Sequence, residues 1–290
     1  MAIGSHPRRT AVLLARGADR KGLVATITGF LYGHGANILH ADQHIDPLAG
    51  MFFQRIEFAV DEMDLALATL RDQLEPLMAD LGMDFELFGH EPLPRVAVLA
   101  SKLEHCLIDL LLRARAGELR GRIVVVVSNH ETVRPLTELF GVPFVYLPVA
   151  PAVREEQEGK LLAVLAAERI DLVVLARYMQ ILSPRVVQAY PLRIINIHHS
   201  FLPAFPGARP YHQAVEHGVK LVGATSHFVS EALDEGPIIE QDVVRVTHRD
   251  TVEDLQRKGR DLERLVLARA VRLWLERRVL CYANKTVVFD

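Results

Sequence analysis

The chain has 290 residues, of which 50% are hydrophobic and 24% charged, with a formal net charge of -3. This balance excludes the basic surplus of a nucleic-acid-binding protein, and the length favours two domains. No segment approaches the roughly 18 to 20 uninterrupted apolar residues of a membrane span, and the first residues lack a secretory signal. We therefore expect a cytoplasmic protein with neither nucleic acid nor membrane as a partner.

The first predicted domain spans residues 8–88. Leu23, Ile27 and Leu31 recur at helical spacing, which predicts an amphipathic helix. The predicted strands are 10–15, 37–45, 51–60 and 82–88, and the predicted helices are 23–31 and 63–80. Their order, βαββαβ, is that of a ferredoxin-like domain.

The residues from Asp19 through Gly22 to Asn37 resemble the ACT domain, a small-molecule-sensing module that usually pairs across subunits. This resemblance implies a homo-oligomer, either a dimer or a tetramer. It also implies an amino-acid effector site near Asp19, Gly22 and Asn37. In the plainer alternative, Gly22 only opens the helix, Asp19 caps it, and the domain holds subunits together.

Residues 89–94 form the predicted linker, because Pro92 and Pro94 suit a stiff connection. The second domain, residues 95–290, alternates apolar runs with helical patterns. The predicted strands are 96–100, 123–127, 144–147, 171–176 and 194–197, and the predicted helices between them include 103–115, 132–140 and 154–169. Buried strands alternating with helices predict a doubly wound, mostly parallel α/β sheet that is covered on both faces.

The end of the second domain contains three further predicted elements. These are a strand at 241–246, a helix at 252–277 and a closing hairpin at 278–288. The helix has an apolar stripe, made of Leu255, Leu262, Leu265, Val266 and Leu273. We expect its charged face to be in solvent.

Polar residues interrupt the strand at 194–197. Asn196 and His198 are two apart, so their side chains project to the same side, whereas His199 should point away. Ligands in doubly wound folds bind at the carboxyl ends of strands. An amide beside an imidazole can hold a developing oxyanion while the imidazole moves a proton. This pair is therefore a candidate catalytic site.

An acidic turn, Leu233–Pro237, follows a few dozen residues later. Considered alone, Asp234 would bond the backbone of its own turn. Asn-x-His followed by Asp-x-Gly-Pro, however, resembles the folate-dependent formyltransferase superfamily, and residues 198–211 resemble more narrowly the formyltetrahydrofolate deformylases. The resemblance implies a catalytic trio of Asn196, His198 and Asp234.

The same resemblance implies that an irregular segment after the strand at 171–176 lines the folate pocket, largely through backbone groups. The implied folate contacts are Met179, Gln180, Ile181 and Leu182. Ordinary packing of apolar loop side chains is the plainer alternative.

The first strand-to-helix turn of the second domain, residues 100–106, contains no glycine. Phosphate-binding turns use glycine to bring backbone donors close to the anion, and here Ser101 and Glu104 predict a helix capping box instead. In the ribonucleotide formyltransferases, which belong to the resembled superfamily, this turn is glycine-rich and holds the phosphate of the acceptor. Without such an acceptor, the formyl group would go to water.

The resemblance thus implies hydrolysis of 10-formyltetrahydrofolate to formate and tetrahydrofolate, which supplies formate for purine synthesis and balances one-carbon folate pools. One alternative is a formyltransferase whose acceptor is not anchored by a phosphate. Another is an amino-acid sensor that only binds folate.

The 13 histidines include five near the candidate site: His198, His199, His212, His217 and His227. They lack the spacing of metal ligands, and the cysteines Cys106 and Cys281 lie far apart in apolar surroundings. We expect no metal and no cofactor beyond the folate substrate. We expect His227 to support the site, and the histidines at 212 and 217 to lie on the surface.

Overall fold

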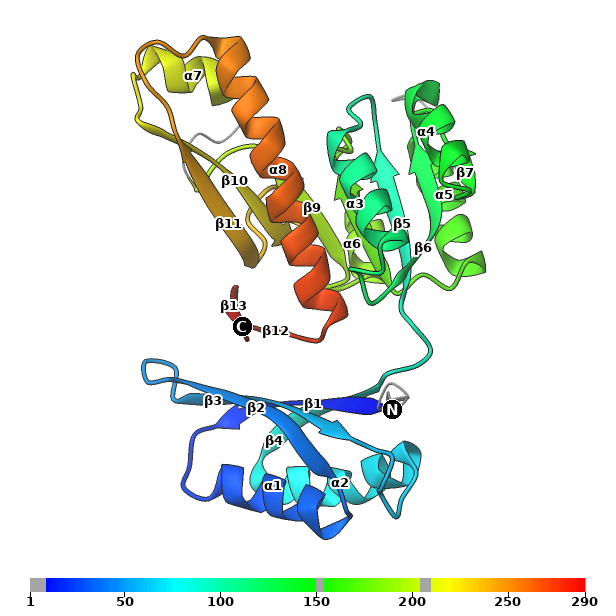
Figure 1. Cartoon of the computed structure of the whole chain (residues 1–290), viewed down its shortest axis with the longest axis vertical. Coiled ribbons are helices and arrows are strands. Elements are labelled where there is room, and N and C mark those ends of the chain that lie inside the picture. Colours follow the sequence, from blue (N-terminus) through cyan, green and yellow to red (C-terminus); the bar gives the residue numbers. More distant parts are fainter. Residues whose placement is uncertain (1–8, 150–153, 204–209, 290) are drawn as a thin grey trace, which may run out of the picture. The chain divides into compact units, whose positions relative to one another are not determined.

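The computed structural model describes residues 9–149, 154–203 and 210–289 (Figure 1). They form two compact units. The first takes in the described residues up to Pro92 together with Arg277–Leu280 and those from Val287 onward, and the second takes in Leu93–Glu276 and Cys281–Thr286. Two terminal segments that we expected in the second domain thus group with the first unit.

The first unit has the expected order βαββαβ. Its elements are β1 (Thr10–Ala18), α1 (Leu23–Gly33), β2 (Asn37–Asp46), β3 (Met51–Ala59), α2 (Leu67–Leu81) and β4 (Met83–Gly89). The antiparallel sheet has the order β2-β3-β1-β4. Both helices lie on one face of it (Figure 1), where their apolar side chains build a core. Ile27 of α1 and Leu74 of α2 are fully buried there in one apolar cluster with Ile56 of β3.

Residues near the C-terminus contact side chains of the first unit. Arg55 of β3 is 1% exposed, forms an ion pair with Glu57 at 2.8 Å and donates from Nε to the carbonyl of Arg277 at 3.0 Å. The guanidinium carbon of Arg277 lies 4.0 Å from the centre of the Phe88 ring. These contacts join segments far apart in sequence, which is why the sequence pattern could not assign this segment to the first unit.

The second unit contains a seven-stranded sheet of order β11-β10-β9-β8-β5-β6-β7. Its strands are β5 (Arg95–Ala100), β6 (Arg122–Ser128), β7 (Phe144–Tyr146), β8 (Leu172–Ala176), β9 (Ile194–His198), β10 (Leu221–Phe228) and β11 (Ile238–Arg245). The pairs from β9 through β7 are parallel, and β10 pairs antiparallel with β9 and β11. The expected mostly parallel sheet is confirmed.

Helices cover both faces of this sheet. They are α3 (His105–Arg115), α4 (Arg134–Leu139), α5 (Arg154–Ala167), α6 (Pro184–Ala189), α7 (Pro210–Glu216) and α8 (Val252–Leu275), with a 3-10 turn, η1 (Glu131–Val133), before α4. Leu165 of α5 and Val186 of α6 pack on one face, and Leu110 of α3 and Val271 of α8 on the other. The closing hairpin, β12 (Val279–Tyr282) and β13 (Lys285–Val288), is as expected.

The order of the sheet reverses between β5 and β8. From β5 the chain adds β6 and β7 on one side, and then returns to place β8 and β9 on the other. In doubly wound folds, ligands bind outside the carboxyl ends of the strands at such a reversal. We therefore expect the functional site among the residues that follow β5, β8 and β9.

Strand β10 was absent from the sequence prediction. Seven of its eight residues are buried, so it shows no apolar and polar alternation. It also contains Gly223, where a Cβ atom would lie 2.8 Å from both the carbonyl of Asp242 and the Cβ of Phe201. Glycine is needed here because β11 and Phe201 lie so close to the backbone of β10. Glycine is uncommon inside strands, so it weakens the pattern by which a strand is predicted from sequence.

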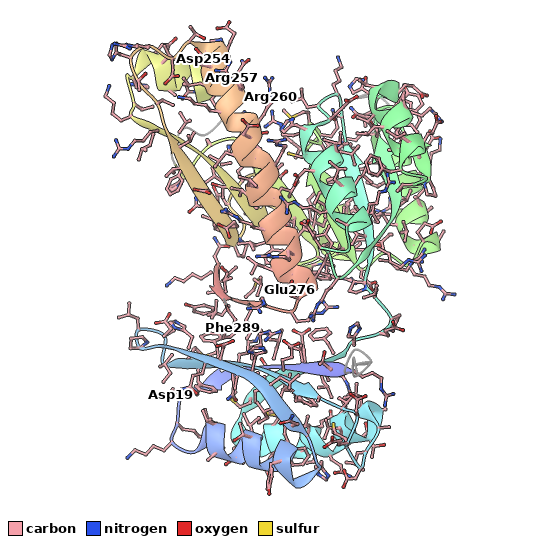
Figure 2. The ribbon with its side chains drawn as sticks, viewed as in Figure 1. Asp19, Asp254, Arg257, Arg260, Glu276 and Phe289 are labelled. Carbon is pink, nitrogen blue, oxygen red and sulfur yellow. The ribbon has the colours of Figure 1, made fainter. Side chains whose placement is uncertain are left out.

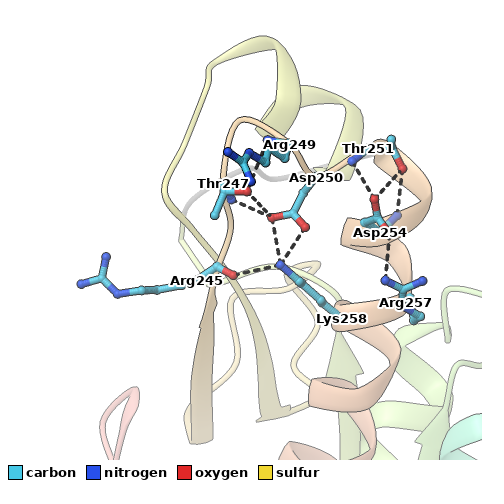
Figure 3. A network of polar contacts seen from close by, with 8 residues as sticks. All are labelled: Arg245, Thr247, Arg249, Asp250, Thr251, Asp254, Arg257 and Lys258. Carbon is cyan, nitrogen blue, oxygen red and sulfur yellow. Dashed lines mark hydrogen bonds and ion pairs between the residues drawn. The ribbon is translucent and has the colours of Figure 1, made fainter.

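Helix α8 begins with a capping box (Figure 3). The Thr251 hydroxyl accepts from the backbone N–H of Asp254, and the Asp254 carboxylate accepts from the backbone N–H of Thr251. Beside it, Lys258 Nζ lies 2.8 Å from both carboxylate oxygens of Asp250. The start of this helix is thus fixed by local pairs that a sequence pattern can reveal.

The predicted stripe of α8 was wrong at two positions. Leu265 is 40% exposed, whereas Glu263, expected in solvent, is 2% exposed. Glu263 lies four residues after Gly259 and four before Leu267, both buried, so it belongs to the inner face at 3.6 residues per turn. We expected Glu263 in solvent because it is charged, and the sequence does not reveal the polar side chains that pair with it inside the protein.

Candidate active site

Two antiparallel neighbours, β9 and β10, carry the first polar side chains of the site. Asn196 of β9 stands opposite His227 of β10, and His198 stands opposite Thr225. Asn196 Nδ2 lies 3.2 Å from His227 Nε2. The strand pairing therefore adds His227 to the pair Asn196 and His198.

Asp234 reaches these side chains from the turn after β10. Its backbone has φ of 58°, and its carboxylate lies with Oδ2 3.3 Å from His198 Nδ1 and Oδ1 3.7 Å from His227 Nε2. Gly236 makes this turn feasible, since a Cβ there would lie 1.7 Å from the carbonyl of Phe228. The structure thus brings Asn196, His198 and Asp234 together, with both carboxylate oxygens facing imidazoles.

The hydrogen bonds of His227 indicate where its proton lies. His227 Nδ1 is 2.9 Å from the carbonyl oxygen of Phe228, which can only accept, so Nδ1 carries the hydrogen. Its Nε2 lies 3.2 Å from the amide nitrogen of Asn196 and 3.7 Å from Oδ1 of Asp234, so the ring faces both groups, and one N–H of the amide stays available for a ligand. His227, 2% exposed, orients this amide, as expected of a supporting residue.

The carboxylate of Asp234 stays ionised in the neutral range. Its contacts with His198 and then with His227 outweigh burial and hold the pKa of Asp234 well below its ordinary value. The pair of Asp234 and His198 is thus suited to moving a proton.

The two ring nitrogens of His198 differ, since Nδ1 is directed at Asp234 and Nε2 is not. Its side chain is 7% exposed, and within the described ranges Nε2 is buried and has no hydrogen-bond partner. Unpartnered buried nitrogens are uncommon. Nε2 is accordingly the atom that we expect to meet a substrate.

A shallow hollow lies along the segment after β8. Gln180, Ile181 and Leu182 line it, and Met179 does not. Its other lining residues are Leu147, Val149, Arg154, Gln157, Glu158, Leu161 and Tyr178. Three of the four expected folate contacts therefore share one cavity.

Ser101 holds this segment in place. Its Oγ donates to Asn129 Oδ1 at 2.7 Å and accepts from the backbone N–H of Met179 at 3.1 Å. The expected capping box of Ser101 with Glu104 was wrong, since α3 starts after Glu104 without a side-chain cap. Ser101 is 3% exposed, so its hydroxyl lies where unpaired polar groups are costly. Bonding these two partners therefore stabilises the chain more than capping α3 would.

The three expected effector residues do not meet within one chain. Asp19, labelled in Figure 2, follows the Ala18 end of β1, whereas Asn37 and Thr10 are both opposite Ala59 at the other end of the sheet. A strand of nine residues separates these ends by about 30 Å. Gly22, with φ of 93°, does open α1, but no side chain caps this helix, so Asp19 does not cap it.

A further polar group, missed from the sequence, surrounds Glu263. Ligand atoms of His105, Cys106 and Glu263 lie within 4.8 Å of one another, close enough to hold one metal ion. Arg177 Nε lies 3.5 Å from the same carboxylate, and burial raises the pKa of the Cys106 thiol. A neighbouring cation and a protonated thiol both oppose metal binding.

Among the helices of the described residues, none has the length and the apolar character that crossing a membrane requires.

Comparison with known proteins now decides the family. Residues 94–271 match the family described as formyl transferase, and residues 11–75 match the ACT domain. A formyltetrahydrofolate deformylase of Synechocystis sp. is 51% identical over 280 residues, covering 97% of this chain and 98% of the relative. This chain belongs to the formyltetrahydrofolate deformylase family.

Solved structures agree with this family assignment. A formyltetrahydrofolate deformylase from Pseudomonas syringae pv. tomato has a TM-score of 0.96 at 46% identity, covering 98% of this chain and 95% of that one. A glycinamide ribonucleotide transformylase from Symbiobacterium toebii has a TM-score of 0.65 at 38% identity and covers 70% of this chain. Deformylases therefore match both units, as the residues quoted for the resemblance predicted.

Proposed function

We propose that this protein hydrolyses 10-formyltetrahydrofolate to formate and tetrahydrofolate, with water as the formyl acceptor. The observation that carries this proposal is the contact of Asp234 with His198 beside Asn196, in a chain of the deformylase family. These three side chains offer a proton acceptor, a proton donor and an amide donor around one space, which hydrolysis of an amide requires.

The reaction divides into addition and collapse. As the oxygen of water bonds to the formyl carbon, Asp234 takes one proton of the water, directly or through a bridging water. The free N–H of Asn196 donates to the oxygen that becomes negative. In the collapse, His198 passes its Nε2 proton to N10 as the bond from carbon to N10 breaks. Formic acid then loses a proton and leaves as formate, Asp234 releases its proton to water, and Nε2 of His198 regains one from water, so that the net products are tetrahydrofolate, formate and one proton.

We assign folate binding to the segment 179–182 and its hollow. Leu182 is half-buried in the apolar cluster of the sheet, and Ile181 presents a carbonyl that already accepts from Arg154. Met179 is 59% exposed, so its contact with folate would come through its backbone or the outer rim. The packing of Leu182 and the hydrogen bond of Ile181 fix the backbone of the segment, so that its N–H and carbonyl groups can bind the pterin ring of folate.

Ser101→Ala should weaken folate binding without removing the chemistry. The change leaves Asn129 Oδ1 and the N–H of Met179 without their partner, at a cost of about 1–3 kcal/mol. We expect a several-fold rise of KM for 10-formyltetrahydrofolate with little change of kcat. Ser183→Ala is the matched control, because the Ser183 hydroxyl has no partner among the described residues. Equal KM values for both variants would contradict this account of the loop.

We also propose that the ACT domain binds a free amino acid between two copies of the chain. Since Asn37 lies at the opposite end of the sheet from Asp19 and Gly22, one site can use all three only if Asn37 comes from a second copy. A homo-oligomer, dimer or tetramer, follows. Light scattering during amino-acid titration, with Asn37→Ala as the variant, tests this; a monomer at all concentrations would refute it.

For the cell, we propose a cytoplasmic reaction whose formate enters purine synthesis and which balances the one-carbon folate pools. This proposal rests on the family assignment. Cells that lack this chain, grown without another source of formate, should then need added formate or purine. Growth unaffected by its loss under those conditions would argue against this role.

The decisive assay follows tetrahydrofolate and formate from 10-formyltetrahydrofolate without any acceptor. Equal amounts of both products over many turnovers would support the hydrolase. A need for an added amine would favour a formyltransferase, and binding without turnover would favour a folate-bound sensor.

The proposed chemistry uses no metal and no cofactor, so EDTA should leave the rate unchanged. Loss that zinc restores would point to His105, Cys106 and Glu263.

A further inference from the structure

Four side chains form a buried ionic group in the second unit. Glu263 of α8 is 2% exposed, with Oε2 2.7 Å from His105 Nε2 and 3.5 Å from Arg177 Nε. The Tyr211 hydroxyl donates to Glu263 Oε1 at 3.0 Å. We call His105, Arg177, Tyr211 and Glu263 the Glu263 cluster.

The Glu263 cluster occupies the place where the fold favours a ligand. His105 opens α3 after β5, and Arg177, with φ of 60°, directly follows β8. These two strands are neighbours at the reversal of the sheet order, and the crevice beyond their carboxyl ends is the usual binding site. In this chain the protein's own charged side chains meet there.

The carboxylate of Glu263 stays ionised although it is buried. Burial alone would raise the pKa of Glu263, but the hydrogen bond with His105 and the charge of Arg177 outweigh it and lower this pKa. Both carboxylate oxygens have partners. The carboxylate of Glu263 therefore meets its partners within the chain.

Helix α8 is shaped to admit Tyr211. Gly259 lies one turn before Glu263, and a Cβ atom there would stand 1.8 Å from the Tyr211 hydroxyl. Only a residue without a side chain lets the tyrosine reach the carboxylate. Gly259 and Glu263 thus fit one tyrosine ring into the crevice.

His199 connects this cluster to the catalytic residues. The centre of its ring lies 5.2 Å from that of His198 and 6.1 Å from that of Tyr211. Burial and then the charge of Arg177 lower the pKa of His199 to about 4, so this ring is neutral near pH 7. Tyr211 and His199 accordingly form an uncharged wall beside His198.

We propose that the Glu263 cluster and His199 exclude amine acceptors from the crevice beside His198, so that only water reaches the formyl carbon. This inference rests on the proposed hydrolysis. Transfer to an amine would form a bond from carbon to the amine nitrogen, which loses a proton, while N10 gains one as its own bond breaks. Such an acceptor needs the volume that Tyr211 fills, whereas water does not.

Tyr211→Ala should open this volume, and Tyr211→Phe, which keeps the ring, is the matched control. The test supplies 10-formyltetrahydrofolate with hydroxylamine, a small amine that is largely uncharged near neutral pH, and measures formate, formohydroxamate and tetrahydrofolate. We expect the ratio of formohydroxamate to formate to rise at least about tenfold in Tyr211→Ala, a change of about 1.4 kcal/mol between the two barriers. Tyr211→Phe should match the wild type.

Each further outcome has a distinct meaning. Hydrolysis by folded Tyr211→Ala with an unchanged product ratio would overturn the inference, whereas a wild type that forms no tetrahydrofolate would overturn the proposed function instead. If circular dichroism shows Tyr211→Ala unfolded, His105→Ala carries the same prediction, because His105 is 13% exposed and borders the same crevice. Folded variants that lose all turnover would place the cluster in the reaction itself and also refute exclusion.

Discussion

His198→Ala is expected to lower kcat for tetrahydrofolate release by about 10²–10⁴-fold, the usual contribution of a positioned proton donor. His198 Nε2 is buried and has no partner among the described residues, while Nδ1 contacts Asp234. Alanine removes the group that we propose gives N10 its proton, but leaves the folate hollow unchanged. Steady-state kinetics together with the folate Kd should therefore show slow turnover with nearly normal binding.

The control for His198 is His212→Ala, since His212 is an exposed residue of α7. It should keep the wild-type rate. Added imidazole should restore part of the activity of His198→Ala only, because the alanine leaves a space for it beside Asp234. If His198→Ala keeps a rate within about tenfold of the wild type, His198 is not the proton donor.

The local signals in the sequence were sufficient for most of the fold and for two of the three proposed catalytic residues. Two-residue spacing placed Asn196 and His198 on one side of β9, and alternation of strands and helices predicted the parallel sheet. Asp234 was assigned only through the family resemblance. Its own turn is an ordinary acidic turn until β10 brings it to the imidazoles.

The features that escaped prediction depend on contacts between distant segments. Helical spacing places Glu263 on the inner face of α8, but no local pattern reveals its partners at positions 105, 177 and 211. Ser101 likewise fits a capping box by spacing, but buried partners from two other segments engage its hydroxyl. Local rules fail where a polar side chain has a stronger tertiary partner.

Asp234→Asn is expected to lower kcat by about 10²-fold or more while preserving the volume of the side chain. The amide cannot take a proton from water, and it removes the negative charge that faces His198 and His227. The matched control is Glu235→Gln, which changes a neighbouring exposed carboxylate and should leave kcat unchanged. A rate for Asp234→Asn equal to that of the control would exclude Asp234 as the proton acceptor.

The difference in stability between the wild type and Asp234→Asn should also depend on pH in one direction. The pKa of Asp234 is lowered in the folded chain, so its ionised form stabilises the fold above the ordinary value of 3.8, and this contribution is lost as the pH falls toward the folded pKa. The wild type should therefore have a higher Tm than Asp234→Asn near pH 7, and the difference should shrink below about pH 4. Because Asp234 stays ionised down to about pH 4, its protonation should not lower kcat at any pH above that value. A Tm difference that grows toward acid would mean that the two imidazoles do not stabilise this carboxylate.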